Sequence, residues 1–254
     1  MTAPILTLEE VTLRFGSVTA LEGLSFSVGH HELVALIGPN GAGKTSVFNC
    51  IDGVYRPDHG RIRVDGVELV GGPGQAAVRG VGRTFQNLGL FRGLTVLDNL
   101  MLGRHLLMKT GFFAGAAWIG RARREEAAHR ARVWDIVELL HLTPFVHWLV
   151  SELSFGWRKR VELGRALVME PRLLLLDEPV GGLAPPDRHE VARYIREARE
   201  RRDLAVVVVE HDMGFVMDLA ERVIVLDAGR CIAAGSPVQV RTDPTVVDAY
   251  LGPG

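Results

Sequence analysis

The strongest constraint on the fold of this chain is the segment GPNGAGKT, which comprises Gly38, Pro39, Asn40, Gly41, Ala42, Gly43, Lys44 and Thr45. An apolar run at 33–37 precedes it and a helix-compatible run at 46–51 follows it. This is the strand–loop–helix context that the phosphate-loop pattern G-x-x-x-x-G-K-[ST] requires. Glycines let backbone N–H groups approach a polyphosphate, and the helix N-terminus adds partial positive charge. We therefore expect this segment, together with Ser46, to bind a nucleoside triphosphate.

Two side chains of this loop have specific expected roles. Lys44 is placed to reach the β- and γ-phosphates of the nucleotide. The hydroxyl of Thr45 is a suitable ligand for Mg²⁺, which prefers oxygen donors. The alternative is a glycine-rich loop that only turns the chain, which the strand before the loop and the helix after it make less favoured.

Composition limits the class of protein. The chain has 254 residues, of which 47% are hydrophobic, enough for one large core with a subdomain. A formal net charge of -1 gives no reason to expect a nucleic-acid partner. Cys50 and Cys231 fit no metal-binding spacing and are expected to be packing residues. We expect no signal peptide and no membrane-spanning run, so a partner would have to supply any helices that cross a bilayer.

Hydrophobic periodicity predicts a β layer, a helical middle and a parallel sheet. Alternating apolar residues predict short antiparallel strands within 5–28, and helical spacing of apolar residues predicts helices between 94 and 165. Further elements are expected in chain order: strands at 61–64 and 81–86, a helix at 158–168, a buried strand at 173–176, a helix at 186–202, a strand at 205–209, a hairpin at 223–233 and a helical tail at 237–251. The apolar piece 109–120 is either a loop packed on the core or an exposed contact patch.

Polar residues follow two of the buried strands directly. Asp177 and Glu178 come after the run LLLL, and His211 follows the run VVVV and Glu210. Carboxylates at the carboxyl end of a buried strand are costly to bury without a purpose. Asp177 is expected to hold Mg²⁺ and Glu178 to act as general base toward a water at the γ-phosphate; the alternative is that both acids cap the next loop. His211 is a candidate sensor of the γ-phosphate, although a lone histidine is more often structural.

Three other positions are ambiguous from the residues alone. Spacing favours Phe15 as a core aromatic, although it could also stack on an adenine ring. Gln86 at a strand end is usually just solvated. Ser154 is placed to cap the helix that follows, and with the backbone of Gly156 it could equally form an anion site.

The order and spacing of these segments resemble the ATPase subunits of ABC transporters over nearly the whole chain. The stretches that carry the resemblance are GPNGAGKT, RTFQN, LSFG, LLLLDEP and VVVVEHD. It implies an α/β phosphate-loop NTPase with a RecA-like parallel-sheet core, an N-terminal antiparallel β layer and a helical signature subdomain. The implied division is a single domain, 1–254, with 1–93 and 166–254 as catalytic core and 94–165 as helical subdomain.

The same resemblance assigns roles to the ambiguous positions. Phe15 falls at the adenine-stacking aromatic, Gln86 at the glutamine of the metal-contacting loop and His211 at the switch histidine. Ser154 and Gly156 would contact the phosphates of ATP held by a second ATPase subunit, so that ATP and Mg²⁺ lie between two chains. Gln86, Lys44, Glu178 and His211 would form the catalytic set.

Four longer stretches resemble the ATPase subunits of branched-chain and hydrophobic amino-acid importers: RTFQNLGLFRGLTVLDNL, KTGFFAG, VEHDMGFVMDLAERVIVLDAG and DPTVVDAYLG. The ATPases of urea importers and of a lipopolysaccharide exporter look related, but KTGFFAG and DAYLG favour the amino-acid group. Implied partners are polytopic permease subunits, a second ATPase that is identical or different, and indirectly a solute-binding protein. The implied location is peripheral, at the cytoplasmic face of the inner or plasma membrane. A soluble ABC ATPase outside transport and a regulatory module without turnover are the alternatives from other classes.

Two residues depart from the family pattern. Trp157 stands where the signature LSGGQ has its glutamine, and Ala184 stands where the family usually has an aspartate. Both belong to the wall that would face the partner subunit. The departures leave open whether that half of the site is degenerate.

Overall fold

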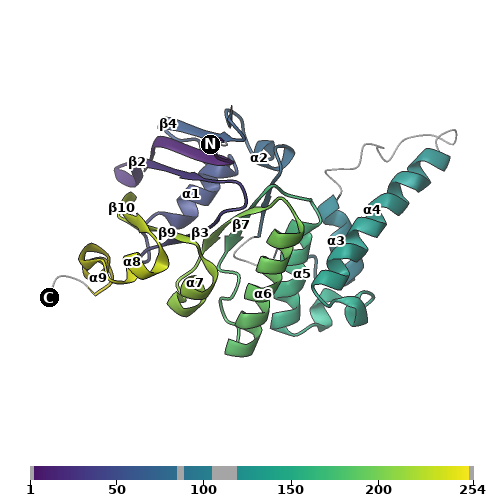
Figure 1. The fold of residues 1–254 in the computed structure, drawn as a ribbon. Helices are drawn as coiled ribbons and strands as arrows, with labels where there is room; N and C mark the ends of the chain where they lie inside the picture. The colour runs from purple at the N-terminus through teal and green to yellow at the C-terminus, as the bar shows by residue number, and fades with distance from the viewer. Residues whose placement is uncertain (1–2, 85–88, 105–118, 252–254) are drawn as a thin grey trace.

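A six-stranded sheet forms the centre of the molecule (Figure 1). The computed structural model describes residues 3–84, 89–104 and 119–251. The strands of the central sheet are, in spatial order, β10 (Arg230–Gly235), β9 (Arg222–Asp227), β3 (Leu33–Ile37), β8 (Ala205–Val209), β7 (Leu173–Asp177) and β6 (Val81–Arg83). All neighbours are parallel except β10 and β9, which form the predicted hairpin. The loop after β3 and the acidic pair after β7 therefore leave the sheet at the same edge.

A second, antiparallel sheet precedes the phosphate loop in the chain. Its spatial order is β2 (Val18–Val28), β1 (Leu6–Phe15), β4 (His59–Val64) and β5 (Val67–Glu68). The antiparallel pairing predicted within 5–28 is confirmed, but the predicted shortness of the strands was wrong, because β1 and β2 are two long strands that pair along their whole length. The register of this pair shifts at several points, and each shift interrupts the alternation of apolar residues that would have revealed one long strand.

The two faces of the central sheet belong to two hydrophobic clusters. Residues of β3 alternate between them: Leu33, Ala35 and Ile37 face one, and Val34 and Leu36 face the other. The second cluster also holds the antiparallel sheet and the inner face of α1 (Lys44–Ile51), which begins at the phosphate loop. The loop is thus anchored on both sides by buried elements.

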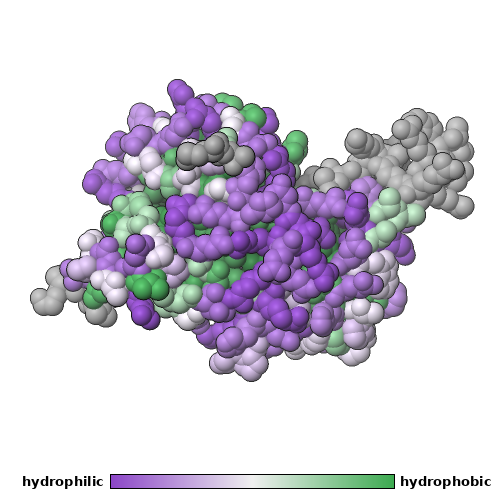
Figure 2. All heavy atoms as spheres, viewed as in Figure 1, coloured by the Kyte–Doolittle hydropathy of each residue, from purple (hydrophilic) through white to green (hydrophobic). Residues whose placement is uncertain are grey.

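The other face of the central sheet is covered by helices (Figure 1). They are α3 (Val96–Arg104), α4 (Ile119–Leu139), α5 (Phe155–Leu167), α6 (Pro185–Arg201) and α7 (Met213–Leu219). Short elements complete the order: α2 (Gln75–Val78), η3 (Thr143–Phe145), η4 (Val150–Glu152), α8 (Pro237–Arg241) and α9 (Pro244–Leu251). The predicted periodic face of α4 is confirmed, since Val133, Ile136 and Val137 are fully buried. The outer surface over α6 is mostly hydrophilic (Figure 2).

Two predictions concern residues that lie wholly or mainly outside the described part of the chain. Gln86 is not described, and of the apolar piece 109–120 only residues 119 and 120 are described, as the start of α4. The strand predicted at 81–86 ends at Arg83 within the described part. Within 3–84, 89–104 and 119–251, no helix combines the length and apolar character that crossing a membrane demands.

Candidate nucleotide site

The phosphate loop is held in shape by close backbone packing. Gly38 has a φ of 151°, and a Cβ built on it would lie 2.1 Å from the carbonyl oxygen of Leu226. Gly43, at the N-cap of α1, has a φ of 102°, and its Cβ would lie 2.6 Å from the carbonyl oxygen of Ala20. Neither position admits a side chain. The loop therefore presents its backbone at the start of α1, where the first N–H groups of the helix have no partner within the helix.

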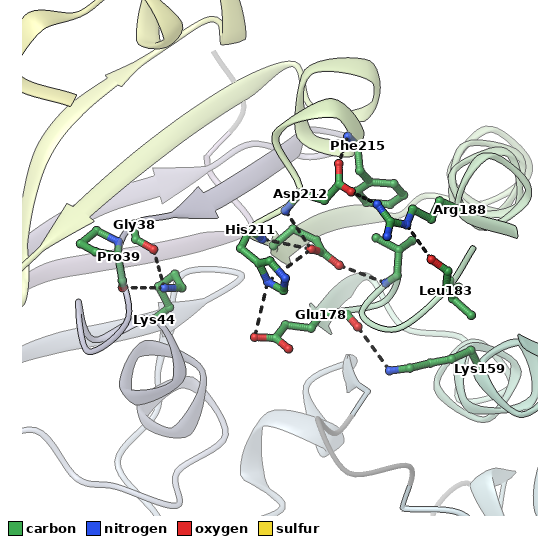
Figure 3. Close-up of polar contacts among 12 residues, drawn as sticks. Gly38, Pro39, Lys44, Lys159, Glu178, Leu183, Arg188, His211, Asp212 and Phe215 are labelled. Atoms are coloured by element: carbon green, nitrogen blue, oxygen red, sulfur yellow. Dashed lines mark hydrogen bonds and ion pairs between the residues drawn. The ribbon is translucent and has the colours of Figure 1, made fainter. Parts of the chain in front are cut away.

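The Lys44 side chain lies back over the same loop. Its ammonium donates to the carbonyl oxygens of Gly38 at 2.7 Å and Pro39 at 2.9 Å (Figure 3). Burial lowers the pKa of Lys44, and the nearby Glu178 and Asp177 carboxylates oppose that shift. The lysine is thus a partly desolvated cation directed at the loop and electrostatically coupled to both acids.

Asp177 is a buried carboxylate with an arginine partner. It is 2% exposed at the end of β7, and Oδ2 accepts a hydrogen bond from Arg83 at 3.1 Å. Burial raises the pKa of Asp177, and the hydrogen bond from Arg83 partly lowers it again. Arg83 also pairs with Asp52 at 2.5 Å. A cation beside Asp177 would favour its charged form.

Glu178 adopts a strained backbone at the edge of the sheet. Its φ is 49°, in the left-handed region that costs free energy for a residue with a side chain. Its N–H donates to the carbonyl of Val209 at 2.9 Å, and its own carbonyl accepts from Lys159 of α5 at 3.3 Å. The side chain is one third exposed and therefore reaches solvent. A carboxylate held in this way can accept a proton from a water molecule at the mouth of the phosphate loop.

His211 lies opposite Glu178 (Figure 3). Its Nδ1 is 3.9 Å from Glu178 Oε1 and 3.9 Å from Glu210 Oε2, and its side chain is mostly exposed. Glu210 itself is 1% exposed and accepts hydrogen bonds from the backbone N–H groups of Val180, His211 and Asp212. The buried carboxylate of Glu210 therefore fixes the backbone that carries the histidine.

Phe15 does not lie in the core, contrary to what spacing alone favours. Phe15 is 46% exposed, and its ring meets the ring of Tyr55 edge to face, with centroids 5.0 Å apart. An exposed aromatic face at the end of β1 is available to a planar ligand. This placement is compatible with the adenine-stacking role that the resemblance implies.

The signature turn, residues 153–156, lies at the start of α5, on a different element from the residues described above. Ser154 occupies the N-cap position but makes no side-chain capping hydrogen bond, so its expected structural role is not realised. A Cβ on Gly156 would be 3.4 Å from Asp187, and a Cβ on Gly182 would be 3.2 Å from the Phe155 ring. The signature turn therefore adjoins the segment after Glu178 in the same chain.

The two departures from the family pattern have different structural contexts. The Trp157 ring packs on Phe145, with centroids 4.4 Å apart, and under the guanidinium of Arg160 at 4.0 Å. It therefore helps to hold the helical segment together. Ala184 is exposed at the N-cap of α6 and has no side chain that could cap the helix.

The structure thus brings Lys44, Asp177, Glu178 and His211 to one edge of the central sheet and places Ser154 on another element. Sequence reasoning missed Arg83 and Glu210, which position the acid and the histidine. Two signals were available: an arginine in the short strand just before Gln86, and an acid directly before His211 at the end of a buried strand.

Comparisons with known proteins all match this chain to ATP-binding proteins of ABC transporters. The family described as ABC transporter matches residues 21–181, and the family described as branched-chain amino acid ATP-binding cassette transporter matches residues 230–252. The chain is 40% identical to the high-affinity branched-chain amino acid transport ATP-binding protein BraF of Pseudomonas aeruginosa and to LivG of Escherichia coli, over 99% of each chain. It is 36% identical to the sulfate/thiosulfate import ATP-binding protein CysA of Bradyrhizobium diazoefficiens, over 94% of this chain and 66% of that protein.

Solved structures give the same fold. A nucleotide-free ATP-binding cassette from an ABC transporter and the ADP conformation of MJ1267 each align with a TM-score of 0.85 at 29% identity. Both alignments cover 99% of this chain and 100% of the other. The α/β phosphate-loop fold predicted from the sequence is confirmed.

Proposed function

Because the chain belongs to the ABC transporter family of ATP-binding cassettes, we propose that it is the ATP-hydrolysing subunit of an importer for branched-chain or other hydrophobic amino acids. The observation that carries the substrate class is the 40% identity to BraF and LivG over 99% of each chain. The match of residues 230–252 to the family described as branched-chain amino acid ATP-binding cassette transporter also supports it. The related CysA protein has a different transported substrate in its description and a lower identity, 36%.

In the proposed reaction, Glu178 accepts a proton from the water that attacks the γ-phosphorus, while the bond from the γ-phosphorus to the bridging oxygen breaks and ADP leaves. Negative charge develops on the γ-phosphate oxygens during this step. Lys44 exchanges its two backbone carbonyl partners for phosphate oxygens, and His211 donates toward the same oxygens. Fixed positive groups aimed at the developing charge lower the barrier more than they favour the ground state.

The donor set suits a magnesium ion. The hydroxyl of Thr45 and the carboxylate of Asp177 are hard oxygen ligands, and the raised pKa of Asp177 marks a carboxylate that a cation would stabilise. When bound with the nucleotide, Mg²⁺ would neutralise charge on the phosphates. Gln86 is proposed as a further contact to the metal.

The site needs a second ATPase subunit to be complete. Ser154 and Gly156 would supply a hydroxyl and a backbone N–H to ATP held by the phosphate loop of the partner. The uncommitted Ser154 hydroxyl at the start of α5 supports this role. We propose that the pair docks on permease subunits at the cytoplasmic face of the membrane and serves a solute-binding protein indirectly.

The test of the catalytic assignment is Glu178→Gln. The variant should bind ATP and form an ATP-dependent dimer with its partner ATPase, while turnover falls by roughly a hundredfold or more, within the range for loss of a general base. Turnover would be followed as phosphate release and dimerisation by light scattering. Near-normal turnover would contradict the assignment of Glu178 as base.

The test of the substrate class is uptake. Cells that make the transporter should take up labelled leucine faster than cells carrying the Glu178→Gln chain. Labelled urea and sulfate serve as comparison substrates. Uptake of urea or sulfate without leucine would overturn the proposed substrate class and leave the ATPase assignment intact.

A further inference from the structure

One arginine joins the segment after Glu178 to the segment that carries His211. Arg188 lies in the first turn of α6, and its Nε donates to the carbonyl oxygen of Leu183 at 2.8 Å. Its Nη1 forms an ion pair with the carboxylate of Asp212 (Figure 3). Asp212 is in turn the N-cap of α7 and accepts from the N–H of Phe215 at 2.9 Å. A single side chain thus fixes the end of one loop and the start of the next helix.

Asp212 follows His211 directly, and Leu183 closes the short turn that begins at Glu178. Within that turn, the N–H of Gly181 donates to the Glu178 carbonyl, and the N–H of Leu183 donates to the Val180 carbonyl. The buried Glu210 carboxylate already joins these two segments, because it accepts from the N–H groups of Val180 and His211. Arg188 adds a second link between the segments that carry Glu178 and His211, whose Oε1 and Nδ1 atoms lie 3.9 Å apart.

We propose that Arg188 is a positioning residue for ATP hydrolysis, which holds Glu178 and His211 at their working separation through Leu183 and Asp212. This inference rests on the roles proposed above for Glu178 and His211. Within the described part of the chain, the hydrogen bonds and the ion pair of Arg188 go to Leu183 and Asp212 and not to the side chain of Glu178 or His211. Its effect should appear in the chemical step and leave nucleotide affinity unchanged.

The planar guanidinium is what makes this arrangement possible. Arginine presents several N–H donors in a fixed plane, so it can bind a carbonyl and a carboxylate at the same time in one geometry. Lysine can keep the ion pair with Asp212, but it cannot reproduce the two-point contact in the same plane. The residue type at position 188 therefore carries a specific prediction.

The same two helices provide a matched control. Farther along α6, Arg196 forms an ion pair with Asp218 of α7 at 2.8 Å and donates to the Asp218 carbonyl at 2.7 Å. This contact joins α6 to α7 with the same chemistry but touches neither loop. Any effect of losing an inter-helix ion pair in general will appear in Arg196→Gln as well.

The experiment compares steady-state ATP hydrolysis by the wild type, Arg188→Gln, Arg188→Lys and Arg196→Gln. We expect Arg188→Gln to lower kcat by roughly tenfold to a hundredfold, the scale expected when reacting groups are misplaced. Its KM for ATP should stay within about twofold, because a change confined to the chemical step leaves binding alone. Arg188→Lys should recover part of kcat, and Arg196→Gln should resemble the wild type.

Equal loss of kcat in Arg188→Gln and Arg196→Gln would overturn the positioning role, as would a change in KM with kcat unchanged. If Arg188→Gln does not fold, Asp212→Asn replaces it, since asparagine keeps the N-cap acceptor while removing the charged partner. Glu178→Gln is measured in parallel. Full turnover by Glu178→Gln would show that the proposed function fails. If Glu178→Gln is inactive while Arg188→Gln and Arg196→Gln have the same kcat, only the positioning role fails.

Discussion

Phe15 shows that the position of a residue along a strand can determine whether its side chain is buried or exposed. Its place at the end of β1, followed by a turn, leaves the residue 46% exposed, whereas the apolar residues before it on the strand are buried. Strand alternation alone could not distinguish an exposed aromatic from a core aromatic. The polar partners of the site residues are more difficult to predict from the sequence. Arg83 and Asp177 are 94 positions apart, and no local sequence pattern indicates a contact over that separation.

At the residue scale we expect Phe15→Ala to weaken ATP binding by about 1–3 kcal/mol, the range for stacking of a base on an aromatic ring. The free energy of unfolding should change little, because Phe15 is already 46% exposed to water. Binding would be measured by calorimetric titration and stability by urea unfolding. Val18→Ala, at the exposed position paired with Phe15 on β2, is the control. A large loss of stability with unchanged affinity would show that Phe15 is a core residue.

The sequence predicted whether a segment forms a strand or a helix better than it predicted the residues at which that strand or helix begins and ends. The buried strands β7 and β8 follow directly from four or five consecutive apolar residues, and both match the prediction within one residue. Helix α5 begins at Phe155, three residues before the predicted 158, and Ser154 occupies its N-cap position without a side-chain capping hydrogen bond. The tail is two helices, since Thr242 and Asp243 interrupt a run that composition alone predicts as continuous.

The start of α6 is an element with an unfilled cap. Ala184 occupies the N-cap, and Pro185 and Pro186 have no N–H, so the N–H of Asp187 is the first donor that a cap could receive. We expect Ala184→Asp to raise the free energy of unfolding by about 1 kcal/mol, as added caps usually do. Urea unfolding checks this, with Ala184→Leu as the variant that cannot cap. An equal response of the two variants would argue against capping.

At the scale of the whole molecule, the helical segment and the sheet share one hydrophobic cluster. Leu100 of α3, Val137 of α4 and Val161 of α5 belong to the same cluster as Ala35 of β3 and Val208 of β8. The order and spacing of the sequence stretches predicted the family fold, since they are tied to the strand ends that build the site. The division into catalytic core and helical subdomain stays a prediction. Because one hydrophobic cluster spans both parts, we expect their unfolding to be coupled.

We expect the chain to unfold in a single cooperative transition without nucleotide. All four tryptophans, Trp118, Trp134, Trp148 and Trp157, lie within 94–165, so their fluorescence reports on the helical segment alone. Far-ultraviolet circular dichroism reports on the whole chain. Coincident urea transitions by the two probes are the expected result, because a shared core couples the parts. Separate midpoints would show that the helical segment unfolds independently.

The tight packing of Gly38 on Leu226 has a genetic consequence. A chain with Glu178→Gln would keep its fold, occupy a place in the transporter and block it, so the allele should be dominant when wild-type subunits are also made. A methyl group at Gly38 would collide with the backbone of β9 and remove the folded chain before assembly. That allele should be recessive, although both changes affect the same nucleotide site.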